Sequence, residues 1–248
     1  MSSTDETTVP DTDPIDARLI DDVHWFADKA KSALGNNLRT LAIYGPAVSS
    51  IYEPRDHRIH VLLVLVDRDV DGLLRLAKSS SAATKRRFAP PLVTTATAMM
   101  ESRDVFPLEW IDIVQYHHVV HGEFDLSLDQ FKPADVRVQC ERDLRSLDIQ
   151  LQRGVLASGG RADRIDALER DAADTLIRVF RGIAFLTGTN IEQLPLQACD
   201  AAAAASGVLL PGCRDSIQAD RLHDLATFRL MLSEIAELIG WINRWQPV

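Results

Sequence analysis

The first half of the chain switches between helical and strand-like spacing of its apolar residues. Val23, Phe26 and Ala30 recur at helical intervals, which predicts a first helix over residues 21–34. The apolar run at 59–66 is continuous, as is typical of a strand that is covered on both faces. By the same rules the sequence predicts a helix over 70–77 and three more strands over 41–44, 91–95 and 109–114. Such alternation indicates an α/β domain.

The predicted strand over 109–114 carries two carboxylates. Its polar and apolar residues alternate at a period of two, which would pack one face and present the other near a cleft. Glu109 and Asp112 are an odd number of positions apart, so a strand would point them to opposite faces. Alternatively, both are polar residues of an edge strand, and the spacing favours this for Asp112.

From Lys132-Pro133 onward the apolar residues repeat only at helical spacing. Val136, Cys140 and Leu144 begin a stripe that predicts a long amphipathic helix ending before Gly159. Further helices are predicted over 165–183, 197–205 and 222–242. We therefore expect an α+β chain with an α/β domain over residues 15–125 and a four-helix bundle over residues 132–248.

The charge of the chain is unevenly distributed. The net charge is −9, of which −6 falls in the first 22 residues, so the remainder is nearly balanced. Residues 1–14 contain almost no apolar side chains, which predicts a disordered acidic tail. The overall acidity speaks against nucleic acid as a partner, but it does not exclude a local site for a smaller anion.

Composition and apolar runs speak against a disordered, membrane-spanning or disulfide-rich protein. The chain is 46% hydrophobic and 25% charged, as in soluble globular proteins. Its longest apolar run, Val61–Val66, is far shorter than the roughly 18–20 residues of a membrane span. The acidic, polar start of the chain is unlike a signal peptide, so we expect a cytoplasmic protein. Cys140, Cys199 and Cys213 show no CxxC spacing and are interpreted as reduced structural thiols.

One pattern in the first half carries a family resemblance. A short apolar run ends at Gly45-Pro46, and Arg58 and His60 stand at the start of the long apolar run, with 12 residues between Gly45 and Arg58. This arrangement resembles the nucleotidyltransferase fold of the DNA polymerase β superfamily, in which a strand enters a Gly-Ser turn and a helix, and the next strand carries an Asp-x-Asp pair. Residues 106–113 and 119–123 resemble the strand and exit segment of a bacterial branch of these proteins.

The resemblance implies a fold and a set of site residues. The fold would be a small mixed sheet with flanking helices, followed by a helical bundle that in many members helps to hold the acceptor. Glu109 would stand at the place of the third catalytic carboxylate. The ligand-binding candidates are Gly45, Ser49, Ser50, Arg55, His57, Arg58 and His60.

This chain departs from the family at the metal ligands. Nucleotidyl transfer needs a divalent metal held by carboxylates and a phosphate held by backbone amides at the turn. Arg58 and His60 replace the two Asp residues; a guanidinium offers no lone pair, and imidazole is a poor ligand for magnesium. Pro46 replaces the Ser of the turn and removes one N–H donor. We therefore expect no metal at this site, with Mg²⁺ and ATP or another NTP as cofactors only of an active enzyme.

Three functions remain open. The first is a catalytically degenerate protein that binds a nucleotide or a phosphorylated ligand, or acts as a scaffold. The second is an active nucleotidyltransferase that transfers NMP to a hydroxyl of a small molecule, nucleic acid or protein. The third is an antitoxin-like interaction protein with a protein partner or a second copy of itself. A helical nuclease is not indicated, because His223 has no Arg at the required spacing before it.

Two further polar clusters have ordinary interpretations. His117, His118 and His121 lack a nearby Cys or carboxylate at metal-ligand spacing and are interpreted as a strand end and turn. Lys85-Arg86-Arg87 is interpreted as a solvated basic turn rather than a nucleic-acid patch.

Overall fold

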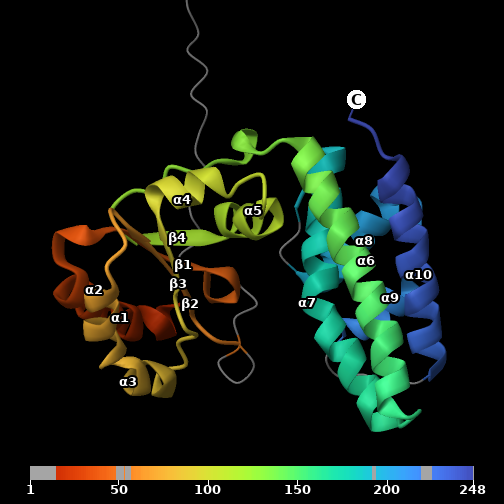
Figure 1. Ribbon diagram of the computed structural model, residues 1–248, viewed down its shortest axis with the longest axis horizontal. Helices are drawn as coiled ribbons and strands as arrows, with labels where there is room; N and C mark the ends of the chain where they lie inside the picture. The colour runs from red at the N-terminus through yellow and green to blue at the C-terminus, as the bar shows by residue number, and fades with distance from the viewer. Residues whose placement is uncertain (1–14, 49–52, 54–56, 192–193, 219–224, 248) are drawn as a thin grey trace, which may run out of the picture. The chain divides into compact units, whose positions relative to one another are not determined.

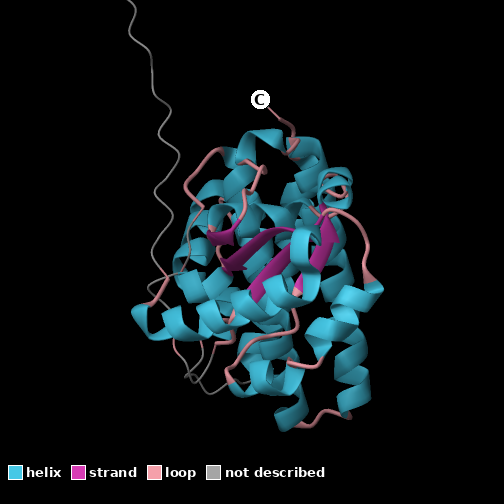
Figure 2. Ribbon diagram, turned by 90° about the vertical axis from the view of Figure 1, so that its left-hand side faces the viewer, coloured by secondary structure: helices cyan, strands magenta, loops and turns pink. Residues whose placement is uncertain are grey.

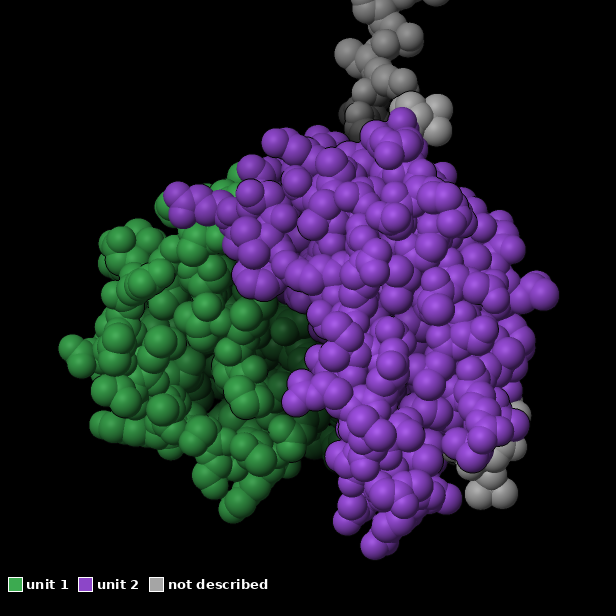
Figure 3. Space-filling model, turned by 45° about the vertical axis from the view of Figure 1, so that its right-hand side comes forward, with its two compact units in different colours: residues 1–100, 116–126 green, residues 101–115, 127–248 purple. Residues whose placement is uncertain are grey.

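The computed structural model describes residues 15–48, 53, 57–191, 194–218 and 225–247, so the tail expected over residues 1–14 lies outside it. The chain divides into two compact units (Figure 3). The first comprises Met1–Met100 and Tyr116–Leu126, and the second comprises Glu101–Gln115 and Ser127–Val248. Residues 101–115, which the hydrophobic pattern assigns to the α/β domain, therefore belong to the helical unit.

The elements of the first unit follow the predicted order up to the third strand, except for helix α3 over residues 80–85, which was not predicted. The helix predicted over 21–34, the helix predicted over 70–77 and the first three predicted strands are confirmed. The bounds are α1 (Ile20–Leu34), β1 (Leu38–Tyr44), β2 (His60–Leu65), α2 (Val70–Ala77), α3 (Ser80–Lys85), β3 (Leu92–Thr95), α4 (Ala96–Glu101) and β4 (His117–His121). A short 3-10 helix, η3 (Gly45–Val48), follows β1 directly.

The four strands form one mixed sheet (Figure 2), and their order in it is β3-β2-β1-β4. Strand β1 pairs antiparallel with β2 and with β4, whereas β2 and β3 are parallel. In this register Tyr44, the last residue of β1, is opposite His60, the first residue of β2. The turn that leaves β1 therefore lies beside the segment that enters β2.

Helix α1 packs against one face of this sheet (Figure 1). Its apolar stripe, which includes Val23 and Phe26, is buried in one cluster with Ile43 of β1 and Leu63 of β2. Phe26 also stacks on Phe88 with ring centroids 4.7 Å apart. Burial of each such side chain contributes roughly 1.5–3 kcal/mol, so this stripe is what holds α1 on the sheet.

The strand predicted over residues 109–114 is wrong, because this segment is helix α5 (Pro107–Gln115). The alternating pattern also fits helical spacing, since Leu108 and Ile111 are three positions apart and both are buried. Pro107 stands at the start of the helix, where its fixed φ and missing N–H are tolerated. The fourth strand is β4 instead, in place of the strand end and turn expected around His117.

The second unit is helical, as expected. The four predicted helices are confirmed as α6 (Pro133–Ser158), α7 (Ala162–Thr187), α8 (Pro195–Ser206) and α10 (Leu225–Arg244), and a short helix that was not predicted, α9 (Pro211–Ser216), lies between the last two. Helix α6 packs against α7 and α10, α8 packs against α7, and α9 packs against α10 (Figure 1). Helix α5 packs within this unit, against α6 and α7. Among the described residues, no helix is both long and apolar enough to cross a membrane.

A glycine lets three of these helices approach closely. A Cβ atom at Gly182 of α7 would lie 2.5 Å from Leu108 Cδ2 of α5 and 2.6 Å from Cys140 Sγ of α6. Both distances are well inside van der Waals contact, so any larger residue here would force these side chains to move.

Candidate functional site

The turn after β1 has the backbone conformation that its glycine predicts. Gly45 has a φ of +73°, in the left-handed region that favours glycine, and its N–H donates to the carbonyl of Tyr116 at 3.0 Å. A Cβ atom at this position would come no closer to another group than 4.0 Å from the His60 Cδ2 atom. Among the described residues, the turn is therefore open beside Gly45, and the His60 ring is the group that a Cβ atom there would approach.

Two histidines flank a tyrosine across the adjoining ends of three strands. Tyr44 of β1 is opposite His60 of β2 and opposite His117 of β4. The rings of Tyr44 and His60 are tilted by 43° with centroids 5.5 Å apart, and the ring of His117 lies 4.6 Å from that of Phe124. Burial raises the pKa of Tyr44, so its phenol remains neutral at physiological pH. Tyr44, His60 and His117 therefore offer hydrogen-bonding groups without negative charge at these strand ends.

The segment that enters β2 is held by backbone contacts while it exposes a cation. The His57 carbonyl accepts from Arg87 Nε at 3.3 Å and from Arg87 Nη2 at 3.2 Å, and the His57 ring Nδ1 accepts from the Glu53 N–H at 3.0 Å. Ile59 is fully buried and bridges to Phe88. Between them the side chain of Arg58 is exposed, and within the described part of the chain it has no hydrogen-bond or ionic partner.

The structure thus brings together only part of the predicted ligand site. Gly45, His57, Arg58 and His60 lie in one region of the first unit, on the end of β1 and the start of β2. The other three candidates, Ser49, Ser50 and Arg55, lie outside the described residues.

Glu109 belongs to the second unit and lies on helix α5 rather than on a strand. Its Oε2 accepts from Gln139 Nε2 at 2.6 Å, and Gln139 Oε1 in turn accepts from the Leu108 N–H at 2.8 Å. Gln139 is buried, so it fixes the Glu109 side chain relative to α6. The premise that Glu109 follows a strand is wrong, and its role as a third carboxylate stays a prediction.

Glu109 is part of a polar cluster between α5, α6 and α7. Asp112 Oδ2 lies 3.1 Å from Arg181 Nη1, and Asp143 Oδ2 accepts from Gln139 Nε2 at 3.3 Å. Burial raises the pKa of both aspartates, and the nearby charge of Glu109 raises each further. The charge of Glu109 affects Asp112 because residues three positions apart on a helix share a face. The prediction that Glu109 and Asp112 point to opposite faces of a strand is therefore wrong.

Sequence patterns did not reveal the α6 and α7 members of this cluster, which are Gln139, Asp143, Arg178 and Arg181. Each is a single polar residue beside an apolar stripe, and such residues usually face solvent. The available signal was spacing: Gln139 and Asp143 are four apart and Arg178 and Arg181 three apart, so each pair shares a helix face. Arg178 Nε is buried without a hydrogen-bond partner in the described structure.

No metal centre is formed by these groups. Among the residues that the structure describes, no group of three or more His, Cys, Asp or Glu side chains could hold a metal ion. The three cysteines are free and buried, and burial raises the pKa of the Cys199 thiol to about 12, so it stays protonated.

The basic turn over residues 85–87 has structural contacts. Arg86 pairs with Asp22 at 3.5 Å and lies 4.7 Å from the centre of the Trp25 ring. Arg87 supports the His57 carbonyl, as described above. These contacts tie the turn to α1 and to the start of β2.

Comparison with known proteins adds no relative. No protein-family model matches the chain, and no curated protein is significantly similar to it in sequence.

Proposed function

We propose that this protein is a catalytically degenerate nucleotidyltransferase-like protein that binds a nucleotide or another phosphorylated anion at the turn after β1, without magnesium. The observation that supports the proposal is the antiparallel pairing of β1 and β2. It sets Gly45 beside the start of β2, which is where the family resemblance expects phosphate-binding and metal-binding groups to meet.

The charges at this site favour an anion over a metal ion. Arg58 is an exposed guanidinium without a partner in the described structure, and a guanidinium can bind a phosphate through two parallel N–H groups. His60 and the neutral phenol of Tyr44 add hydrogen-bonding groups next to the open turn. At the two positions that the resemblance aligns with metal ligands, Arg58 and His60 carry no negative charge, so these positions do not need a cation to bridge them to a phosphate.

Loss of transfer follows from the same replacements. Neither Arg58 nor His60 can replace the two carboxylates that hold magnesium and help to activate an acceptor hydroxyl. Glu109 alone supplies one carboxylate, and it is engaged by Gln139. In this proposal Glu109 is dispensable for ligand binding.

Isothermal titration with ATP, GTP and tripolyphosphate, each with magnesium and with EDTA, tests the proposal. Binding is expected to persist in EDTA and to weaken at least tenfold in Arg58→Ala, because a charge-assisted bidentate contact is worth more than about 1.5 kcal/mol. Arg68→Ala is the matched control, since Arg68 is also exposed but follows the opposite end of β2.

Two results would overturn the proposal. One is magnesium-dependent transfer of label from an α-labelled nucleotide, lost in Glu109→Gln, which would establish an active enzyme. The other is equal binding by the Arg58→Ala variant, the Arg68→Ala variant and the unaltered protein, or no binding at all.

A further inference from the structure

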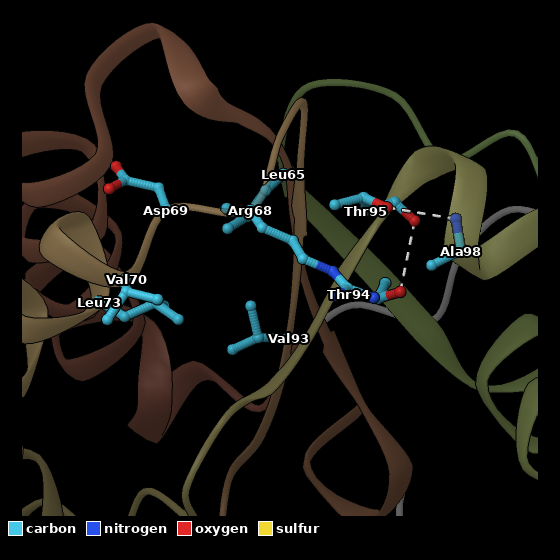
Figure 4. A pocket seen from close by; sticks show the side chains of 9 residues that line it. All are labelled: Leu65, Arg68, Asp69, Val70, Leu73, Val93, Thr94, Thr95 and Ala98. Carbon is cyan, nitrogen blue, oxygen red and sulfur yellow. Dashed lines mark hydrogen bonds between the residues drawn. The ribbon is translucent and has the colours of Figure 1, made fainter.

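A second concave site lies in the first unit, at the other end of strand β2. It is a cavity of about 290 Å³ at the carboxyl ends of the parallel strands β2 and β3, where Leu65 and Thr95 are the last strand residues (Figure 4). Crevices outside the carboxyl ends of parallel strands are the places where open α/β sheets hold ligands. The volume lies near the lower limit of small-molecule pockets.

The walls of this cavity are largely aliphatic. Leu65, Leu73, Val93 and Val70 contribute apolar side chains from β2, β3 and α2. Val70 is 70% exposed, so apolar surface at the rim is available to a ligand. An apolar body of modest size would gain free energy by covering these groups.

One cation lies at the cavity and is not neutralised. Arg68 is exposed and has no ionic or hydrogen-bond partner within the described part of the chain, and in Figure 4 its side chain extends across the cavity toward Thr94. The nearby carboxylate of Asp69 points away from the Arg68 side chain and interacts with other groups. Asp69 accepts from the Gly72 N–H at 2.8 Å and lies 3.6 Å from Arg75 Nη2.

The backbone around Arg68 is fixed before any ligand binds. Asn37 Nδ2 donates to the Asp67 carbonyl at 2.9 Å, and the Asp67 N–H donates to Asn37 Oδ1 at 2.8 Å. On the other side, Thr95 Oγ1 accepts from the Ala98 N–H at 3.2 Å, which leaves the hydroxyl proton of Thr95 available to donate. The cavity therefore combines a cation on a fixed backbone segment, a hydroxyl donor and apolar walls.

We infer that this cavity binds a small organic acid, with its carboxylate on Arg68 and the Thr95 hydroxyl and its apolar body against Leu65, Leu73 and Val93. A single cation matches the single charge of a carboxylate, whereas a phosphate dianion would leave a charge unpaired against apolar walls. The site is independent of the anion site proposed at the turn after β1, because it is formed at the opposite end of β2.

Benzoate and its neutral counterpart benzamide are suitable probes, and saturation-transfer NMR on the full chain measures both. Benzoate is expected to bind with a dissociation constant on the order of 1 mM, as suits a ligand of this size, and benzamide at least tenfold more weakly. Arg68→Ala is expected to weaken benzoate binding at least tenfold, and Ala98→Phe to abolish it by filling the cavity.

Lys29→Ala is the control, because it removes a positive charge from an exposed position of α1 that belongs to neither proposed site, and it should leave benzoate binding unchanged. Arg68 is exposed, so its replacement tests the site without threatening the fold, which circular dichroism verifies. Equal binding of benzoate and benzamide, binding unaffected by Arg68→Ala, preference for inorganic phosphate, or no benzoate binding at 10 mM (roughly ten times the expected constant) would each overturn the inference.

Discussion

Asp112 of α5 and Arg181 of α7 form an ion pair at 3.1 Å inside the helical unit. Their side chains are only 22% and 14% exposed. Attraction to Arg181 lowers the pKa of Asp112, but burial raises it more, so the net direction is upward. The Asp112 carboxylate therefore neutralises the nearby charge of Arg181, but the cost of burying it offsets most of this attraction, so the ion pair contributes little net stability.

Replacing Asp112 should separate these two effects. Asp112→Ala leaves Arg181 buried without its partner and is expected to lower the free energy of unfolding by about 3 kcal/mol. Asp112→Asn keeps an oxygen that Arg181 can bond and carries no charge, so its cost is expected to be below about 1 kcal/mol. Urea denaturation at pH 7 measures both.

The exposed pair formed by Asp200 and Arg214 supplies the control. These side chains are 57% and 41% exposed, and water screens their interaction. Asp200→Ala should leave the urea midpoint unchanged. A loss in Asp200→Ala equal to that in Asp112→Ala would contradict the assignment of the effect to burial.

The raised pKa of Asp112 also predicts how stability changes with pH. The folded state holds the Asp112 proton more tightly than the unfolded chain, whose pKa is near 3.8. The stability from this group is fully present below that value and is lost as the pH rises through the higher folded pKa. The stability of the unaltered protein relative to Asp112→Asn should therefore fall as the pH rises from about 4 through the folded pKa. A relative stability that rises over this range would show that attraction to Arg181 outweighs burial.

Two helical glycines should respond to alanine in opposite directions. Gly182→Ala places a Cβ atom against Leu108 and Cys140 and is expected to destabilise the protein by about 1–3 kcal/mol. At Gly240 of α10 the nearest group to a Cβ atom is the end of the Arg244 side chain, at 3.4 Å. Gly240→Ala should therefore stabilise the protein by about 0.5–1 kcal/mol through helix propensity. Thermal unfolding of the two variants tests the close approach of α7 to α5 and α6; a rise in Tm for Gly182→Ala would refute it.

Glu234 of α10 holds the start of α9. Its buried carboxylate accepts from the Gly212 N–H at 2.8 Å and from the Cys213 N–H at 2.7 Å, one bond to each oxygen. In Glu234→Gln one of those oxygens becomes an NH₂ group that cannot accept, so the loss is expected to be about 1.5–3 kcal/mol. Glu237→Gln on the same helix is the control because Glu237 is exposed. Equal chemical-denaturation midpoints for the two variants would rule out the capping role.

Helix and strand positions were predictable where the apolar pattern had a single interpretation. The apolar run of β2 and the long stripe of α6 are of this kind. The run is short and rich in valine and leucine, which favours a strand, and the stripe keeps steps of three and four along a long segment, which favours a helix. The segment around Glu109 fits both a strand and a helix, and packing against α6 and α7 decides in favour of the helix. Only Pro107, a favoured first helical residue, pointed to that result.

The polar contacts were less accessible to sequence reasoning. Asp112 and Arg181 are 69 positions apart, and nothing local indicates that two helix faces bring them together. By contrast, the approach of Gly45 to His60 follows once β1 and β2 are known to be antiparallel, because one residue follows β1 and the other begins β2. Pairing direction, however, depends on long-range contacts that periodicity does not encode.

Restoring carboxylates at the start of β2 tests whether Arg58 and His60 occupy former ligand positions. The double variant Arg58→Asp, His60→Asp reintroduces two anionic oxygen ligands of the kind that magnesium prefers. Binding of ATP by this variant is expected to become magnesium-dependent and to weaken in EDTA, the reverse of the unaltered protein. Isothermal titration with and without magnesium provides the measurement.

The matching double variant Arg58→Asn, His60→Asn controls for the loss of positive charge without adding negative charge. It should bind ATP weakly whether or not magnesium is present, because an amide oxygen is a neutral and weaker ligand for a hard cation. If both double variants behave alike, the carboxylates are not placed to share an ion with the phosphates, and the alignment of Arg58 and His60 with the family's metal ligands is wrong. If only the Asp variant gains the magnesium dependence, the phosphate groups of ATP and the two restored carboxylates meet at one ion. That outcome would support loss of an ancestral metal site by replacement of its ligands.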